Sequence, residues 1–329
     1  MKKFVLVFTS LFVYSLCLAA DLDYDYKNLI GKLDVADEVK TIEKNSPNLF
    51  WGKMVDYNES FKQFIIDMKK NWWPEKEALR KSANIPRFYP QYDESVIESA
   101  KPYCDSIFNT MGISDLDVNC SLHIIYSDDI NAYTVLTEDG FAICITSALF
   151  TKKGINDNII RGYIAHELVH GLLQHHTRRI YEVAKKKRKN QLIAGIISGL
   201  YVFNETYNSV RYDASNQDYL SNYSFWIENL NNKSKISTLK YAFKYSREQE
   251  YEADLIAFRF MEFQGLGEEF LNGLRILGTE YDDLFDDFND HPTIISRINF
   301  LKYALDNPSL GNTINKKIIR KRKFENDEW

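Results

Sequence analysis

The chain has 329 residues, of which 45% are hydrophobic and 26% are charged, and its formal net charge is -5. This composition is that of a globular protein, and the length allows one large domain or two modest ones. So mild an acidic excess gives no electrostatic reason to expect a nucleic-acid partner, and that class of function is set aside.

The first 20 residues have the pattern of a secretory signal peptide. Two lysines precede an apolar run of 15 residues, Phe4–Leu18, and the small residues Ala19 and Ala20 follow it. The run is shorter than the roughly 20 residues that span a bilayer, so an uncleaved anchor is the alternative. Bulky Leu16 before Cys17 disfavours a lipoprotein. We therefore expect export and cleavage after Ala19 or Ala20.

Three cysteines remain once the leader is removed, namely Cys104, Cys120 and Cys144. An exported protein folds where disulfides can form, and this odd number permits at most one internal pair. Their separations match no metal-binding CxxC spacing. We expect structural or buried thiols and no catalytic cysteine.

Helical periodicity dominates residues 21–113. Within this region apolar side chains recur at spacings of three and four: Phe61, Phe64, Ile65 and Met68. The run Trp72-Trp73-Pro74 then interrupts the pattern. We expect these side chains to lie in the core, and the region to pack on the domain that follows.

The pattern changes between Val118 and Phe150. Two short β-rich runs, Leu122–Tyr126 and Phe141–Thr146, are separated by polar segments, and the turn-forming sequence Glu138-Asp139-Gly140 comes before the second run. These features predict a small sheet.

Two long helices are predicted after the sheet. The first covers Asp157–His176 and is capped by Asn156 or Asp157. Its apolar side is formed by Ile160, Tyr163, Ile164 and Leu168. The second runs from about Ile236 to Phe263, either unbroken or broken near Ser246. A further helix is expected to start at Asp290-His291-Pro292.

Two basic runs occur in the second half of the chain. Residues 185–189 are all basic and are followed by the apolar segment Leu192–Phe203, and a second run covers Lys316–Lys323. Twelve apolar residues are too few to cross a bilayer, but a basic cluster beside an apolar helix can bind an anionic membrane surface. Peripheral membrane contact through Lys185–Phe203 is one expectation, and a solvated helix face is the alternative.

An HExxH motif is formed by His166-Glu167-Leu168-Val169-His170, a pattern typical of zinc metalloproteases. Residues four apart on a helix lie roughly 40° apart around its axis, so both imidazoles project from one face and can bind one Zn²⁺. Glu167 lies one residue further round and can reach the water that the metal activates. The motif predicts His166 and His170 as ligands and Glu167 as the general base.

A catalytic zinc site needs a third protein ligand and an open position. Glu250 and Asp254 form the one E-x-x-x-D pair in the sequence, and Glu250 follows His170 by 80 residues. The spacing places both carboxylates on one helix face, so Glu250 can bind the metal while Asp254 accepts a hydrogen bond from a ligand histidine. Glu248 and Glu252 are rival ligands by proximity, although neither has an aspartate four residues on.

Several segments together resemble the HtpX-like, CAAX-prenyl-protease-type zinc metallopeptidases. Besides the two metal motifs, these segments are Asn131-Ala132-Tyr133, Gly140–Leu149, His175, Ser246-Arg247 and His291-Pro292 with Arg297. The similarity covers roughly Leu122 to Leu301. It looks most like the soluble exported branch with the BepA-like proteases, because no segment between the metal motifs is long enough to cross a membrane. Two features depart from the family pattern: Val169 replaces its usual small residue, and the residues up to Trp329 lack the pattern of the helical repeats that some relatives carry.

The resemblance implies a gluzincin fold in which two helices deliver the ligands of one zinc ion per chain. It implies that an edge strand with Asn131, Ala132 and Tyr133 holds the substrate backbone. It also places His291 near the metal, either as a donor to the developing oxyanion or as an inhibitory fourth ligand.

Two further residues are expected to support the site rather than to react. By the same resemblance, Arg297 is the ion-pair partner that fixes the His291 loop. His175 is expected to have a structural role close to the ligands.

We therefore expect an α+β protein in which a mainly helical gluzincin domain, residues 114–310, has a small β-sheet beside the HExxH helix. The other parts are the signal peptide (1–20), the helical region (21–113) and a basic tail (311–329). The expected function is a periplasmic or secreted zinc endopeptidase acting on misfolded or misassembled envelope proteins. The alternatives are a zinc hydrolase of small amides or esters, and a chaperone-like or scaffold protein with a structural or closed zinc site. The oligomeric state stays open.

Overall fold

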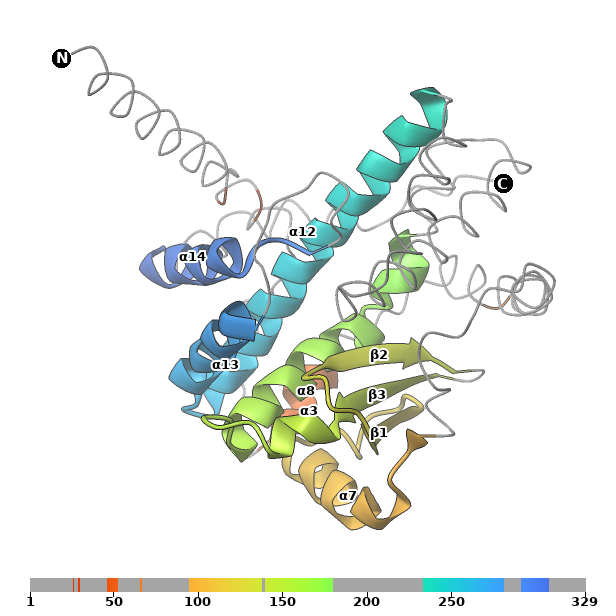
Figure 1. Ribbon diagram of the computed structural model, residues 1–329, viewed down its shortest axis with the longest axis vertical. Coiled ribbons are helices and arrows are strands. Elements are labelled where there is room, and N and C mark those ends of the chain that lie inside the picture. Colours follow the sequence, from red (N-terminus) through yellow and green to blue (C-terminus); the bar gives the residue numbers. More distant parts are fainter. Residues whose placement is uncertain are drawn as a thin grey trace.

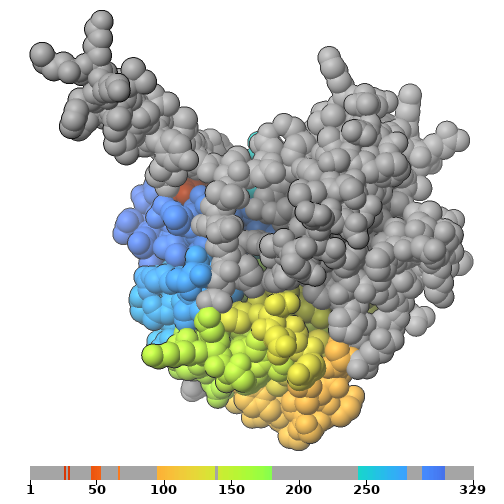
Figure 2. Space-filling view, in the orientation of Figure 1, coloured from red at the N-terminus to blue at the C-terminus, as the bar shows by residue number. Residues whose placement is uncertain are grey.

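A computed structural model describes residues 46–52, 95–137, 140–179, 233–280 and 291–307, together with Tyr26, Leu29 and Ile66. The predicted leader, both basic runs and the membrane-contact segment lie outside the described residues, as do Phe61, Phe64, Ile65 and Met68. In the space-filling view the described parts form one continuous body, with α7 (Lys101–Thr110, orange) at one end and α14 (Ile294–Asp306, blue) at the other (Figure 2).

The sheet has three strands in the order β1 (Cys120–Ile125), β3 (Phe141–Thr146) and β2 (Ala132–Leu136). β3 runs parallel to β1 and antiparallel to β2. Every residue of β3 is buried, whereas every residue of β2 is half-buried, as a central strand and an edge strand should be. The two predicted β-rich runs are confirmed as β1 and β3. The residue pattern alone did not predict β2.

The HExxH helix, α8 (Asp157–Leu172), lies between the sheet and the helices α12 (Lys233–Phe263) and α13 (Gly267–Glu280) (Figure 1). Its predicted apolar side is buried. Asn156 is the N-cap, because its side chain accepts a hydrogen bond from Ile159 N at 3.0 Å. Gly171 allows the close approach to the sheet, since a Cβ atom there would overlap the Phe141 ring.

The mainly helical fold with a small sheet confirms the predicted α+β class. α12 runs unbroken from Lys233 to Phe263, so the helix predicted from about Ile236 to Phe263 is confirmed and the break near Ser246 does not occur. Ala253 and Ala257 are completely buried and leave space for close helix contact. α14 begins at Ile294, where Thr293 caps it through the Ser296 amide at 3.2 Å.

The predicted helix Asp157–His176 is wrong at its C-terminal end. α8 stops at Leu172, Gln174 has a φ of 52°, and a new helical segment covers residues 175–179. A side chain with a Cβ adopts this left-handed conformation at a cost of about 1–2 kcal/mol. The turn changes the direction of the chain directly after the HExxH motif.

Aromatic residues from the N-terminal region pack on α12. Phe50 and Trp51 of α3 (Pro47–Gly52) are 0% exposed, and their ring centroids lie 5.3 and 4.3 Å from that of Phe260. Trp51 Nε1 donates to the carbonyl oxygen of Met111 at 3.0 Å. This segment therefore contributes to the same hydrophobic core as the helices that follow.

The described ranges contain neither a membrane-spanning helix nor a disulfide. No helix there has an apolar stretch long enough to cross a bilayer. Cys104, Cys120 and Cys144 form no disulfide there.

Candidate metal centre

Two imidazoles and one carboxylate meet between α8 and α12. His166 and His170 lie one turn apart on α8, with their Nε2 atoms 3.1 Å from each other. Glu250 on α12 places Oε2 at 3.3 Å from His166 Nε2 and Oε1 at 3.3 Å from His170 Nε2. Within the described part of the chain, these three residues are the group of His, Cys, Asp and Glu side chains that can hold a metal ion. The structure thus brings the predicted ligands together.

The donor atoms fit a zinc ion. Ligand atoms about 2.0 Å from a shared tetrahedral centre lie about 3.3 Å from one another. The observed contacts of 3.1 to 3.3 Å match that spacing. Glu250 Oε2 is buried and receives no hydrogen bond of regular geometry from the described residues, so a cation would satisfy it. Two imidazoles and one carboxylate also leave a fourth zinc position for water or substrate.

His166 is held by a buried carboxylate. Its Nδ1 lies 3.0 Å from Asp254 Oδ1, and Asp254 is 0% exposed. Arg297 of α14 donates to both oxygens of the same carboxylate, from Nε at 2.7 Å and from Nη2 at 2.6 Å. The ion pair keeps Asp254 ionised, and Asp254 keeps the proton of His166 on Nδ1. The Nε2 lone pair therefore points to the metal position.

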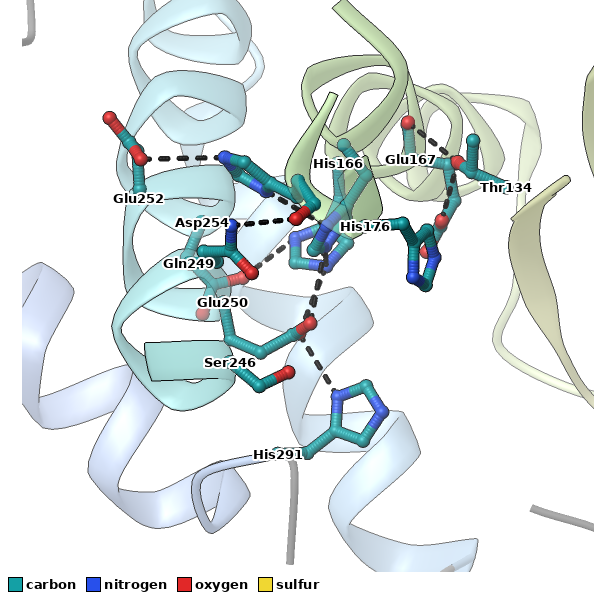
Figure 3. A network of polar contacts seen from close by, with 12 residues as sticks. Thr134, His166, Glu167, His176, Ser246, Gln249, Glu250, Glu252, Asp254 and His291 are labelled. Carbon is teal, nitrogen blue, oxygen red and sulfur yellow. Dashed lines mark hydrogen bonds and ion pairs between the residues drawn. The ribbon is translucent and has the colours of Figure 1, made fainter. Parts of the chain in front are cut away.

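His170 has a different partner. Its Nδ1 lies 2.9 Å from Nδ1 of His175, which is 2% exposed. The other ring nitrogen of His175 lies 3.4 Å from Glu252 Oε2. Gln249 Nε2 donates to the carbonyl oxygen of His175 at 2.8 Å, which ties the new helical segment to α12. Glu252 therefore faces His175 rather than the metal position (Figure 3).

The Glu167 side chain contacts β2 through Thr134 (Figure 3). The hydroxyl of Thr134 lies 2.7 Å from the carbonyl oxygen of Glu167 and 2.9 Å from its Oε2, so its one proton can be donated to either. Burial raises the pKa of Glu167 to about 7, helped by the charge of Glu250 and opposed by His166 and Thr134. A carboxyl group with that pKa can both take up and release a proton near neutral pH.

The ligand residues influence one another's protonation. Burial alone would lower the pKa of His166, but the neighbouring carboxylates of Asp254 and Glu250 raise it to about 9. Burial lowers the pKa of His170 well below its usual value. Burial would raise the pKa of Glu250, but His291 and His170 hold it well below its usual range. A bound cation takes over the role of the His166 proton, which is released when the metal binds.

His291 lies at the rim of the site. Its Nδ1 is 3.1 Å from Glu250 Oε2, and its side chain is 34% exposed, more than the side chains of the three ligands (Figure 3). It comes from the segment that leads into α14. The structure thus places His291 next to the metal position, as the family resemblance implied.

The backbone of β2 uses only one of its two edges within the described residues. The carbonyl oxygen of Asn131 accepts from Thr146 N at 3.0 Å, and Thr137 N donates to Gly140 O at 3.1 Å. In an antiparallel pair every second residue turns its backbone groups to the partner strand. Asn131 and Tyr133 therefore pair with β3, whereas Ala132, Thr134 and Leu136 present N–H and C=O groups at the other edge.

Sequence reasoning missed the role of Thr134 and assigned no partner to Glu252. Thr134 directly follows Asn131-Ala132-Tyr133, but one polar residue in a strand does not indicate which side chain it contacts. Glu252 was considered only as a rival ligand. Glu252 and Glu248 are four residues apart, as Glu250 and Asp254 are, so spacing alone does not show which glutamate lies at the metal position. The turn at Gln174 brings His175 to Glu252 and so gives Glu252 a different partner.

The buried ion pair of Asp254 with Arg297 generates a stability prediction. Arg297→Met should lower the free energy of unfolding by about 3–5 kcal/mol, because Asp254 is left as a buried charge without its cation. Denaturant unfolding followed by circular dichroism measures this. Arg275→Met is the matched control, since its ion pair with Glu268 has side chains 44% and 70% exposed and should contribute less than about 1 kcal/mol. Equal losses in both variants would contradict the prediction.

Comparison with known protein families agrees with this geometry. The model of peptidase family M48 matches residues 105–305, which include all three strands and both metal motifs. No curated protein and no solved structure matches the chain. Because the family match covers more than half of the 329 residues and contains all three ligands, the chain belongs to peptidase family M48, a family of zinc metallopeptidases.

Proposed function

We propose that this metallopeptidase is an exported endopeptidase that cleaves extended segments of misfolded or misassembled envelope proteins. One observation supports the choice of an extended polypeptide above all. The ligands, the base Glu167 and the outward backbone groups of β2 are joined through the contact of Thr134 with Glu167. A chain that adds to β2 as a further strand would lie beside the base.

The residues divide the reaction among them. When bound by His166, His170 and Glu250, a zinc ion supplies a Lewis acid that polarises the scissile carbonyl and makes water a better nucleophile. Glu167 takes a proton from the attacking water and returns it to the leaving amine. The hydroxyl of Thr134 orients the Glu167 carboxylate from the substrate side.

His291 serves as the donor to the developing oxyanion in this proposal. Its ring lies beside Glu250 and is partly open to solvent, so a substrate carbonyl can approach it.

The role of Glu167 as the base can be tested by substitution. Glu167→Gln should keep zinc and lose at least about 100-fold in the rate of casein cleavage, because a glutamine keeps the shape but accepts no proton. Bound zinc is measured by elemental analysis of the same samples, and a chelator with zinc add-back serves as the control for metal dependence. Retained cleavage by Glu167→Gln would refute its role. Zinc binding without cleavage by the wild-type protein would favour the scaffold alternative.

The edge of β2 predicts a two-residue periodicity in the substrate. When one backbone amide of a peptide substrate is N-methylated, kcat/KM should fall only for every second position of the methyl group. Alternate amides face the strand to which the peptide adds. Each sensitive position should lose about 5- to 10-fold in kcat/KM, as expected for one lost hydrogen bond of about 1 kcal/mol. Uniform loss, or no loss, along the peptide would contradict strand addition.

Export rests on the leader pattern of residues 1–20 and on the similarity to the BepA-like branch. The mature protein from a host with a secretory pathway should begin after Ala19 or Ala20. N-terminal sequencing and cell fractionation measure this, and a chain that keeps its first residues in the cytoplasm would refute it.

A further inference from the structure

We propose that His175 and Glu252 form a relay that holds the proton of His170 on Nδ1 and so presents its Nε2 lone pair to the metal. The two are positioning residues, because neither reaches the reacting atoms. The inference rests on the zinc chemistry of the proposed function but concerns residues outside the ligand set.

The tautomers follow from the order of the contacts. His170 Nε2 faces Glu250 and His166 Nε2, so it must offer a lone pair to a cation and its proton must be on Nδ1. That proton points at His175 Nδ1, 2.9 Å away, which must therefore accept it. His175 then carries its own proton on Nε2, which faces Glu252 Oε2 at 3.4 Å.

The opposite arrangement is disfavoured at both ends. If His175 carried its proton on Nδ1, two N–H groups would face each other across 2.9 Å, and the Nε2 lone pair would face a carboxylate. His175 is 2% exposed, so water cannot compensate. His175 Nε2 is buried and has no other hydrogen-bond partner among the described residues, and the Glu252 carboxylate is the anionic group beside it.

The backbone is arranged to make this contact. In a continuous helix, residues five apart point about 140° away from each other, so an uninterrupted α8 would turn His175 away from His170. The end of α8 at Leu172 and the left-handed Gln174 instead bring His175 back to the ligand. Gln249 fixes the new segment from α12. A strained backbone conformation, such as that of Gln174 next to His175, is typical of functional positions.

The experiment measures zinc affinity of the purified protein by competition with a chelator. His175→Leu should bind zinc about 10- to 100-fold more weakly, the usual cost of losing a ligand's hydrogen-bond partner. His175→Asn keeps an acceptor for His170 and should lose less than about 5-fold. Glu248→Gln, one turn before Glu252 on α12, is the matched control and should leave affinity unchanged.

A double-mutant cycle isolates the relay. Glu252→Gln should weaken zinc binding about 5- to 10-fold in the wild-type background, because a glutamine can stabilise either tautomer of His175. The same change should have no effect in the His175→Asn background, where the relay is already interrupted. Glu252→Gln concerns a partly exposed side chain, so this arm stays decisive if His175→Leu fails to fold.

A second readout needs no activity. In zinc-bound protein with ¹⁵N-labelled histidine, nuclear magnetic resonance should show His175 with its proton on Nε2, and Glu252→Gln should shift it toward the other tautomer. Unchanged tautomer and affinity in Glu252→Gln would overturn the relay while leaving the peptidase assignment intact. Failure of the wild-type protein to bind zinc would instead overturn the proposed function and the relay with it.

Discussion

The metal centre depends on one buried carboxylate, that of Asp254. It accepts a hydrogen bond from His166 on α8 and is neutralised by Arg297 on α14, so three helices distant in the sequence meet at its two oxygens. A buried carboxylate without partners costs several kcal/mol, so other arrangements of these helices are disfavoured. Glu250 lies one turn before Asp254 on the same face of α12, and its position next to the two imidazoles follows from this constraint.

Local spacing explains what could be predicted from the sequence. The pairs His166 with His170 and Glu250 with Asp254 are each four residues apart, and helix geometry places both members of each pair on one face. The cap of α8 and the strands β1 and β3 are equally local patterns, and they were predicted with small errors at their ends. That the two pairs meet is a long-range fact, and the sequence supported it only through the scarcity of E-x-x-x-D pairs and the family resemblance.

The features that escaped prediction depend on contacts between distant segments. Apolar and polar residues continue the helical pattern past Leu172, so nothing local shows the turn at Gln174. The sequence of β2 lacks the alternation of a half-buried strand, and its one hydroxyl contact with α8, from Thr134 to Glu167, joins segments distant in the chain. Glu252 has the chemistry of a metal ligand, and only the position of His175 gives it another partner.

The two ligand histidines are supported unequally. His166 contacts a carboxylate directly, whereas His170 is separated from its carboxylate by a second imidazole. The direct contact belongs to the helix packing that holds the domain together. The contact of His170 with Glu252 through His175 depends on the turn after α8. The domain can therefore keep its fold while the orientation of His170 changes.

The aromatic residues of α3 have a practical consequence for work with this enzyme. Phe50 and Trp51 cover Phe260 of α12, yet they precede the region that matches the family, which begins at residue 105. A fragment trimmed to that region would expose an apolar surface on α12. The fragment would lose about 1.5–3 kcal/mol of folding free energy for each large side chain removed. Exposed apolar patches of this kind promote aggregation. The hydrophobic core therefore extends beyond the region that sequence comparison delimits.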